Sequence, residues 1–403
     1  MTTMPNPNPL LDDARRIAPD ITALRRAIHA EPELGLHTPK TRDKVRAALA
    51  GLPLEWREGP STTGLVAVLK GTAGEGGRVL LRGDMDALPM PEETGLPFAS
   101  TVEGRMHACG HDAHTAMLAG AARLLCSRRA EIAGEVLFMF QPGEEGWHGA
   151  RFMLDDGLID PLPHAAFALH VMPNAPHGVV AGRAGPLLAA ADQIEITIEG
   201  RGGHASLPHE TLDPVPVACE VVTAIQAMVA RKFNAHDPVI VTIAAIQAGT
   251  AHNVIADRAV MKGTIRTLSA AHRIAVREAL ELLVSGIASA HGMTAQLIVT
   301  EGFPVTVCDA GAVDFGQRVT AELFGSQAFL RLGDPIMGAE DFAYVLEKVP
   351  GAMFFLGVAH EGDDWSQCCG IHSTRMMLDE SVMPQGSALL AGLAERFLAN
   401  GFG

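Results

Sequence analysis

Met106-His-Ala-Cys-Gly-His-Asp-Ala-His114 is the stretch around which the rest of the chain can be interpreted. Its nine residues carry three imidazoles, a thiol and a carboxylate, which are groups that bind borderline-soft and hard metal ions. Cys109 and His111 can face one ion if the backbone bends at the glycine between them. Residues 115–129 have a helical composition, and the N-terminus of that helix would favour the thiolate form of Cys109. The stretch therefore predicts a metal site at a helix N-terminus, and the alternative is a capped helix with scattered histidines.

Three predicted strands around this stretch lead to polar side chains. Residues 78–82, 135–140 and 165–169 are apolar enough for strands of a sheet that is covered on both faces. Open α/β sheets build their sites at the carboxyl ends of strands, so the polar groups that follow these strands are expected to converge. Taken alone, the two glutamates among them fit a solvated turn and the histidine fits a core position. The groups are Asp84 and Asp86 after the first strand, Glu144 and Glu145 after the second, and His170 after the third.

The chain is predicted to form two domains, because 403 residues exceed the usual size of one hydrophobic core. Residues 1–190 and 304–403 are assigned to a discontinuous α/β domain, and residues 191–303 to an inserted domain. The insert has the order β-α-β-β-α-β, the split arrangement of a ferredoxin-like α+β sandwich. Helices of the α/β domain are expected at 10–29, 38–49, 310–324 and 384–400. In the insert, strands are expected at 193–199, 238–246, 258–267 and 294–301, and helices at 214–232 and 270–291.

Composition excludes several classes of protein. The formal net charge of −15, with dispersed lysine and arginine, argues against a nucleic-acid partner. No apolar run approaches 18 uninterrupted residues, so no membrane span is expected. The first residues lack the basic start and apolar stretch of a signal peptide, and the six cysteines are too sparse for a disulfide scaffold. A cytoplasmic protein with reduced thiols is therefore expected.

Taken together, the motifs resemble a known family. The chain is similar to the di-metal aminoacylase and carboxypeptidase superfamily, and most similar to its amidohydrolase branch of hippurate hydrolases, N-acyl-amino-acid hydrolases and indole-acetyl-amino-acid hydrolases. The matching motifs occur in order over nearly the whole chain. They are Arg82-Gly-Asp-Met-Asp-Ala-Leu-Pro, His107-Ala-Cys-Gly-His-Asp-Ala-His, Pro142-Gly-Glu-Glu, Leu169-His170, Gly202-Gly-His-Ala-Ser-Leu-Pro-His and Gly338-Ala-Glu-Asp-Phe.

The resemblance implies a fold and a set of metal ligands. It implies a phosphorylase/hydrolase-like catalytic domain, with the inserted sandwich as a lid and dimerisation domain of a homodimer or higher homo-oligomer. It also implies two divalent ions per subunit and assigns the catalytic base to Glu144. Zinc, manganese, nickel and cobalt all suit the implied donor set. The implied ligands are Cys109, His111, Glu145, His170 and His372.

The expected reaction is hydrolysis of the amide bond of an N-acyl amino acid, such as an N-acetyl or N-benzoyl derivative. Two cations can activate both the water and the carbonyl group, and Glu144 is expected to accept the proton of the water. Asp86 is expected to orient a ligand imidazole. By resemblance, His204 would donate to the developing oxyanion.

Other assignments and alternatives accompany this interpretation. By resemblance, Asn253 and Arg266 would bind the carboxylate of the substrate, although Arg266 also fits a surface position on a strand. The alternatives are a dipeptidase or carbamoylase on the same scaffold, a non-catalytic metal- or ligand-binding protein, and an enzyme with a Cys109 nucleophile and a His111 base. No role is assigned to Asp84, His107, Asp112, His114 and His209.

Overall fold

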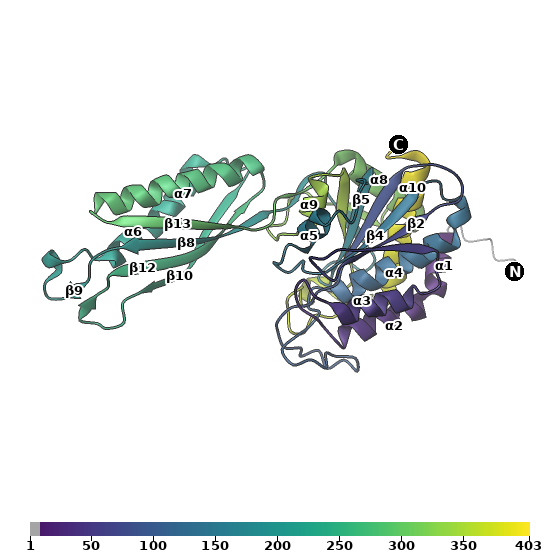
Figure 1. Ribbon diagram of the computed structural model, residues 1–403, viewed down its shortest axis with the longest axis horizontal. Coiled ribbons are helices and arrows are strands. Elements are labelled where there is room, and N and C mark those ends of the chain that lie inside the picture. Colours follow the sequence, from purple (N-terminus) through teal and green to yellow (C-terminus); the bar gives the residue numbers. More distant parts are fainter. Residues whose placement is uncertain (1–8) are drawn as a thin grey trace. The chain divides into compact units, whose positions relative to one another are not determined.

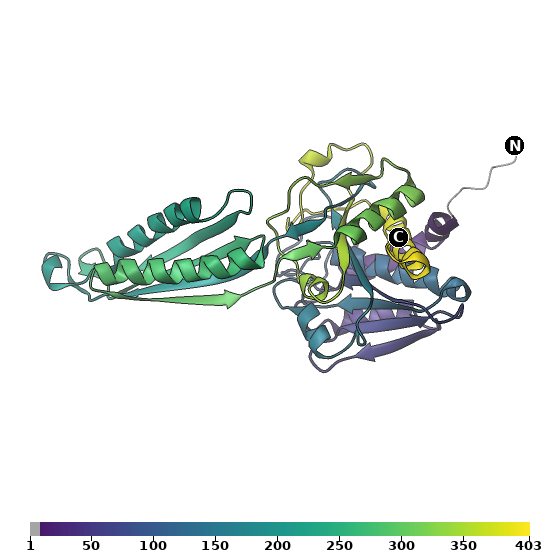
Figure 2. The same cartoon turned by 90° about the horizontal axis from the view of Figure 1, so that it is seen from above.

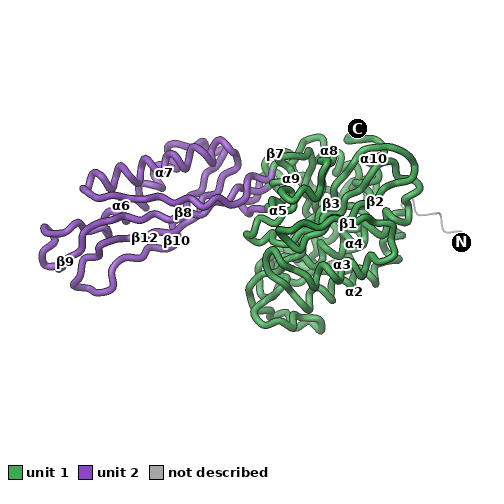
Figure 3. The backbone as a smooth tube through the Cα atoms, in the orientation of Figure 1, with its two compact units in different colours: residues 1–187, 307–334, 341–403 green, residues 188–306, 335–340 purple. Residues whose placement is uncertain are grey.

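The computed structural model describes residues 9–403, and these fall into two compact units (Figure 3). Unit 1 comprises Met1–Leu187, Val307–Asp334 and Asp341–Gly403, and unit 2 comprises Leu188–Thr306 and Pro335–Glu340. Residues 335–340, assigned from the sequence to the α/β domain, thus cluster with unit 2. The expected absence of a signal peptide concerns residues 1–8, which lie outside the described residues.

Unit 1 is built on a large mixed sheet, whose centre is β3 (Arg78–Asp84). β4 (Glu135–Gln141) and β5 (Ala165–Met172) lie on either side of β3 and run parallel to it. β16 (Gly351–Gly357) continues the parallel arrangement beyond β5. Because these strands are parallel neighbours, the residues that follow them meet at one edge of the sheet, as predicted. The outer strands are β1 (Leu54–Glu58) and β2 (Leu65–Lys70) on one side, and β6 (Val180–Gly182) and β15 (Phe329–Arg331) on the other.

Helices of unit 1 cover the sheet, and the residues of β3 are all buried. α4 (His111–Ser127) and α10 (Met383–Asn400) lie side by side and both contact β3 and β5 (Figures 1 and 2). α4 is rich in alanine and buried on almost every side, because α10 and the N-terminal helices pack around it. The remaining helices are α1 (Pro9–Arg16), α2 (Ala18–His29), α3 (Pro39–Ala48), α5 (Gly149–Asp155), α8 (Ala310–Phe324) and α9 (Ala343–Leu346).

The structure corrects two details of the predicted elements. The single helix expected at 10–29 is two helices, α1 and α2, interrupted at Ile17. Pro19 explains the break, since its ring lacks an N–H and would clash with the carbonyl group four residues earlier. His170 lies within β5 rather than after its last residue.

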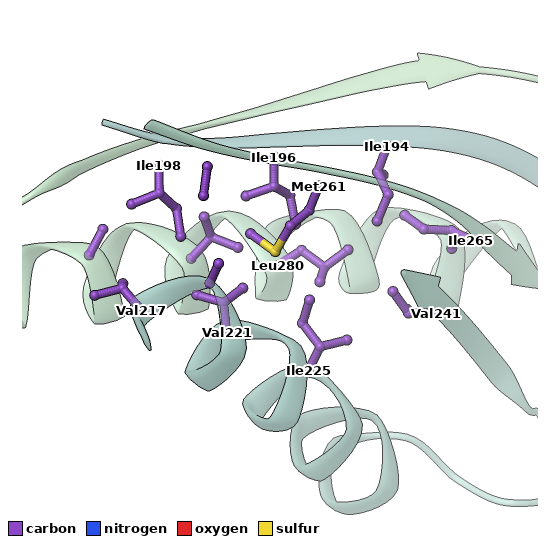
Figure 4. Packing of buried hydrophobic residues seen from close by; sticks show 14 of the residues in the cluster. Ile194, Ile196, Ile198, Val217, Val221, Ile225, Val241, Met261, Ile265 and Leu280 are labelled. Carbon is purple, nitrogen blue, oxygen red and sulfur yellow. The ribbon is translucent and has the colours of Figure 1, made fainter. Parts of the chain in front are cut away.

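Unit 2 pairs an antiparallel sheet with two helices. The strand order is β10 (Val239–Ala248), β12 (Arg258–Thr267), β8 (Ala190–Glu199) and β13 (Thr294–Glu301). α6 (Pro214–Lys232) and α7 (Ala270–Ala290) pack on one face, where alternate residues of the strands form an aliphatic core (Figure 4). Among its residues are Ile194, Ile196, Val221, Met261 and Leu280. A short pair, β9 (Gly203–His204) and β11 (Val254–Ile255), forms a separate ribbon.

One described helix is long and apolar enough to cross a membrane by length and composition. This is α6, with a mean hydropathy of 1.2 over the tested window, 28% of which is buried. The helix was not predicted as a span from the sequence, because Glu220 interrupts its apolar residues. Val217, Val221 and Ile225 of this helix belong to the core of unit 2. Core helices of soluble proteins can have the same length and composition, so the observation is weak evidence for a span.

Candidate metal centre

The bend at the start of α4 brings the side chains of Cys109 and His111 close together. Gly110 precedes the helix with φ +87°, a left-handed conformation that glycine adopts readily. A Cβ atom at this position would lie 2.3 Å from Val171 Cγ2, so the residue is also held close to β5. The predicted bend at Gly110 is therefore present, and both neighbouring side chains are buried in the same cluster.

Asp86 connects this helix to the loop that follows β4. Its carboxylate accepts hydrogen bonds from the backbone N–H groups of Glu144, at 2.9 Å, and Glu145, at 3.0 Å. Its backbone carbonyl oxygen lies 2.8 Å from His111 Nδ1, whereas its carboxylate is 3.5 Å from that nitrogen. Asp86 was expected to orient an imidazole through its carboxylate. In the structure the carbonyl group is the closer of the two contacts to the His111 ring, and the carboxylate also holds the backbone of the two glutamates.

His170 faces Cys109 across the cluster. Its Nδ1 lies 2.7 Å from the carbonyl oxygen of Val171, to which a protonated Nδ1 donates. That tautomer leaves the lone pair of Nε2 directed at Cys109 Sγ, which is 3.4 Å away. Burial holds the pKa of His170 well below its usual value, so the ring is neutral and able to bind a cation.

His372 reaches the cluster on a strained loop. It has φ +63°, which is uncommon for a residue other than glycine and is often found at functional sites. Its backbone N–H donates to the carbonyl oxygen of Ala108, 2.8 Å away. Its Nε2 lies 3.3 Å from Glu145 Oε1. Hydrogen bonds to Cys109 and Glu145 raise the pKa of His372 to about 10, so its surroundings favour positive charge.

The five expected ligands form two overlapping groups. The donor atoms of Cys109, His111 and His170 lie within 4.8 Å of one another, and so do those of Cys109, Glu145 and His372. Cys109 belongs to both groups. Glu144 is next to the cluster, with its Oε2 3.9 Å from His111 Nε2.

The donor set fits two divalent cations. Among the described residues, His111 Nε2 is a buried atom without a hydrogen-bond partner, and it lies 4.0 Å from the buried Glu145 Oε1. A buried nitrogen lone pair and a buried carboxylate oxygen are costly unless a cation or proton satisfies them. Thiolate, imidazole and carboxylate donors together suit first-row divalent metals. Cys109, His111, Glu145, His170 and His372 would therefore be able to hold the metal ions.

The environment of Cys109 differs from the prediction. Burial raises the pKa of its thiol, and the neighbouring His111 offsets this only in part. The helix N-terminus therefore does not by itself hold Cys109 as a thiolate, because desolvation of the buried sulfur opposes ionisation. A high pKa also disfavours the alternative in which Cys109 is the nucleophile.

Asp84 and His114 form a hydrogen bond with each other close to His111. His114 Nδ1 lies 2.6 Å from Asp84 Oδ1, and its Nε2 accepts a hydrogen bond from Val171 N–H at 2.8 Å. The second oxygen of Asp84 accepts from Arg82 at 2.6 Å. Both residues are buried and have their hydrogen bonds within the protein, which is typical of a structural support rather than of a metal ligand.

The expected substrate-binding residues lie in unit 2. His204 and Asn253 are brought together in the ribbon of β9 and β11, where Ala205 N–H donates to the carbonyl oxygen of Asn253 at 3.0 Å. His204 Nδ1 accepts a hydrogen bond from Ser206 N–H at 3.1 Å. Arg266 is on β12, and burial lowers the pKa of its guanidinium. Their expected roles remain predictions, and His209 is an exposed residue of the same unit.

A buried charged group beside the first turn of α4 was not predicted from the sequence. Arg25 and His29, from α2, both contact Asp112. Their spacing of four residues places them on the same face as the buried Ile21 and Ile28. The available signal was the presence of charged residues on the apolar face of an amphipathic helix.

The fold and the donor set define an α/β metallohydrolase. A family model described as peptidase family M20/M25/M40 matches residues 80–396. The chain is 38% identical over 373 residues to an N-acetylcysteine deacetylase of Bacillus subtilis (strain 168), covering 92% of this chain and 95% of that protein. It is 37% identical over 394 residues to thermostable carboxypeptidase 1 of Saccharolobus solfataricus, covering 96% of this chain and 98% of that protein.

Solved structures agree with these relatives. The crystal structure of a Bacillus subtilis dinuclear metal-binding peptidase from the M20 family has a TM-score of 0.83 and 34% identity to this chain, covering 96% of this chain and 99% of the other. The chain belongs to peptidase family M20/M25/M40, and the resemblance inferred from its motifs is confirmed.

Proposed function

We propose that this protein hydrolyses the amide bond of N-acyl amino acids, with Glu144 as the general base. It is a metal-dependent amidohydrolase with a dinuclear centre, in agreement with its family, its deacetylase relative and its dinuclear structural neighbour. The observation that carries the proposal is the convergence of five donors beside one further glutamate. Hydrolysis of an amide needs an activated carbonyl group and a base that accepts the proton of water. Metal ions held by the five donors would activate the carbonyl group, and the further glutamate would be the base.

The two overlapping groups suggest how the ions are shared. Cys109, His111, His170, Glu145 and His372 would hold the two ions, since their donor atoms fall into two groups that share Cys109. When bound, the cations supply Lewis acidity that polarises a carbonyl oxygen and makes water more acidic. Zinc, manganese, nickel and cobalt remain candidates, since availability decides among metals that suit the same donors.

Glu144 would carry out the proton transfers in this proposal. As the oxygen of water attacks the carbonyl carbon, a carboxylate oxygen of Glu144 would accept one proton from that water. The carbon–nitrogen bond then breaks, and Glu144 would give the proton to the departing amine nitrogen. General acid–base catalysis of this kind typically contributes about 10²–10⁴ in rate. Asp86 would position this base, because it binds the backbone of both Glu144 and Glu145.

Unit 2 would act as a ferredoxin-like lid and dimerisation domain. Its β-α-β-β-α-β order, with both helices on one face of the sheet, supports the ferredoxin-like description. His204 would donate to the developing oxyanion, and Asn253 and Arg266 would bind the carboxylate of the substrate. In this proposal residues 1–190 and 304–403 form the catalytic domain and residues 191–303 the insert. A homodimer in the cytoplasm completes the proposal.

A substrate comparison tests the reaction. N-acetyl, N-benzoyl and dipeptide substrates of the same amino acid should be assayed side by side with protein reconstituted with each metal. We expect the N-acyl substrates, hippurate among them, to have the highest kcat/KM. Higher kcat/KM for dipeptides would instead favour the dipeptidase alternative, for which the similarity to a carboxypeptidase provides a reason.

Two adjacent substitutions separate the base from the ligand. Glu144→Gln should retain two metal ions and lose about 10²–10⁴ in kcat, whereas Glu145→Gln should lose metal. Metal content is measured on the purified proteins by elemental analysis. If Glu144→Gln turns over within a few-fold of the unsubstituted enzyme, Glu144 is not the base.

A further inference from the structure

A buried ion-pair network lies beside the first turn of α4. Asp112 Oδ2 accepts a hydrogen bond from Arg25 Nε at 2.9 Å and lies 2.8 Å from His29 Nδ1. Arg25 is 2% exposed, and His29 and Asp112 are fully buried. Three ionisable groups taken out of water cost several kcal/mol unless they pair with good geometry, so the chain maintains this contact against a substantial penalty.

Further carboxylates hold the two cationic side chains in place. His29 Nε2 lies 3.1 Å from Glu92 Oε1, and Arg25 Nη1 lies 2.9 Å from Glu380 Oε1. Both ring nitrogens of His29 therefore face carboxylates. Although burial alone would lower the pKa of His29, Asp112 and Glu92 raise it to about 9, and the ring is an imidazolium that donates on both sides.

Contacts from other elements hold the first turn of α4. Gly110 occupies its N-cap position and provides no side-chain cap. Asp112 follows His111 directly and precedes the part of α4 that packs on the sheet. A shift of Asp112 would move His111, because the two residues share one helical turn.

We propose that Arg25 and His29 position the first turn of α4 through Asp112, and so set the affinity of the metal centre. They are positioning residues, which touch neither metal nor substrate. The inference rests on the proposed metal ligands. It adds that Arg25, which precedes Asp112 by 87 residues, supports the turn that carries one of them. Partners that orient metal ligands typically contribute about 10–100-fold to metal affinity.

Two substitutions of His29 separate its contact with Asp112 from its contact with Glu92. In His29→Asn the amide nitrogen can replace Nδ1 and keep the hydrogen bond to Asp112. In His29→Gln the longer side chain can reach Glu92 in place of Nε2 but loses Asp112. Arg26→Gln is the control, because Arg26 belongs to the same helix and shares Glu380 with Arg25 but does not contact Asp112, so this variant measures the effect of loosening Glu380 alone.

Binding of Co²⁺ to the metal-free full-length protein is measured through the thiolate-to-cobalt absorption band. Thermal unfolding of the metal-free protein is measured in parallel. We expect His29→Gln to raise the Kd at least about tenfold. His29→Asn should stay within about threefold of the unsubstituted protein, and Arg26→Gln should match it. If His29→Gln does not fold, Arg25→Lys should raise the Kd in the same way, since a lysine ammonium cannot reproduce the Nε contact.

The outcomes distinguish this inference from the proposed function. If the unsubstituted protein binds no Co²⁺, the proposed metal centre fails, and the positioning role fails with it. If the unsubstituted protein binds Co²⁺ and His29→Gln binds it equally well, only the positioning role is overturned. Equal weakening by His29→Asn and His29→Gln would also overturn it, because the bond to Asp112 would then be irrelevant.

Discussion

Substitution of Gly110 by alanine tests how the fold places the two ligands at the start of α4. The backbone there has φ +87°, which costs an alanine roughly 1–2 kcal/mol. The new Cβ would also lie 2.3 Å from Val171 Cγ2, closer than any relaxed contact. Overpacking of this kind typically costs about 1–3 kcal/mol, so the total expected loss is about 2–5 kcal/mol.

Gly104 provides the matched control. It has φ +70°, and a Cβ there would meet nothing within 4 Å. Gly104→Ala should therefore show the backbone cost alone, about 1–2 kcal/mol. The difference between the two variants isolates the contact of the α4 N-cap with β5.

The assay is urea unfolding of the metal-free protein, monitored by tryptophan fluorescence. All three tryptophans, at positions 56, 147 and 365, belong to unit 1, so the signal reports on the unit that contains the metal centre. The Co²⁺ affinity should fall in Gly110→Ala and not in Gly104→Ala. Only Gly110 lies between the two expected ligands Cys109 and His111, so only its substitution changes their relative position. Equal destabilisation by the two variants, within about 0.5 kcal/mol, would refute the reasoning.

Three further predictions concern the site and its supports. Asp86→Ala should lower kcat at least about tenfold by releasing the backbone of Glu144 and Glu145, and steady-state kinetics giving an unchanged kcat would contradict it. Chelation should abolish activity and lower the Tm, and added Zn²⁺, Mn²⁺, Ni²⁺ or Co²⁺ should restore both; activity that survives dialysis against chelator would exclude the metal route. The raised pKa of His29, about 9 against an ordinary 6.5, contributes stability that is complete below pH 6.5 and is lost as pH rises to about 9. The contribution is at most about 3 kcal/mol, and unfolding of the unsubstituted protein and His29→Asn at pH 6 and pH 9.5 should show this difference shrink; a constant difference would contradict it.

Local sequence patterns were enough to predict most elements, whereas the expected metal donors followed from the resemblance of the motifs to a known family. The strands that became β3, β4 and β5 could be recognised because uninterrupted apolar runs are typical of a sheet covered on both faces. Since parallel strands end at one edge, the polar residues after them were expected to converge, and the structure places His170 in one donor group with Cys109, and Glu145 in another. Short elements such as β1 and α5 escaped prediction, because a few residues carry too little periodicity.

By itself, then, the sequence indicated which residues carry groups that can bind metal and roughly where in the α/β order they lie, because donor chemistry and hydrophobic period are local properties. Only the tertiary structure decided what each supporting residue does. The carboxylate of Asp86 binds the backbone of Glu144 and Glu145, and Arg25 contacts Asp112 from 87 residues away. Contacts between distant segments depend on how the helices pack and on the orientation of individual side chains. Neither property leaves a pattern along the chain that could be recognised before folding.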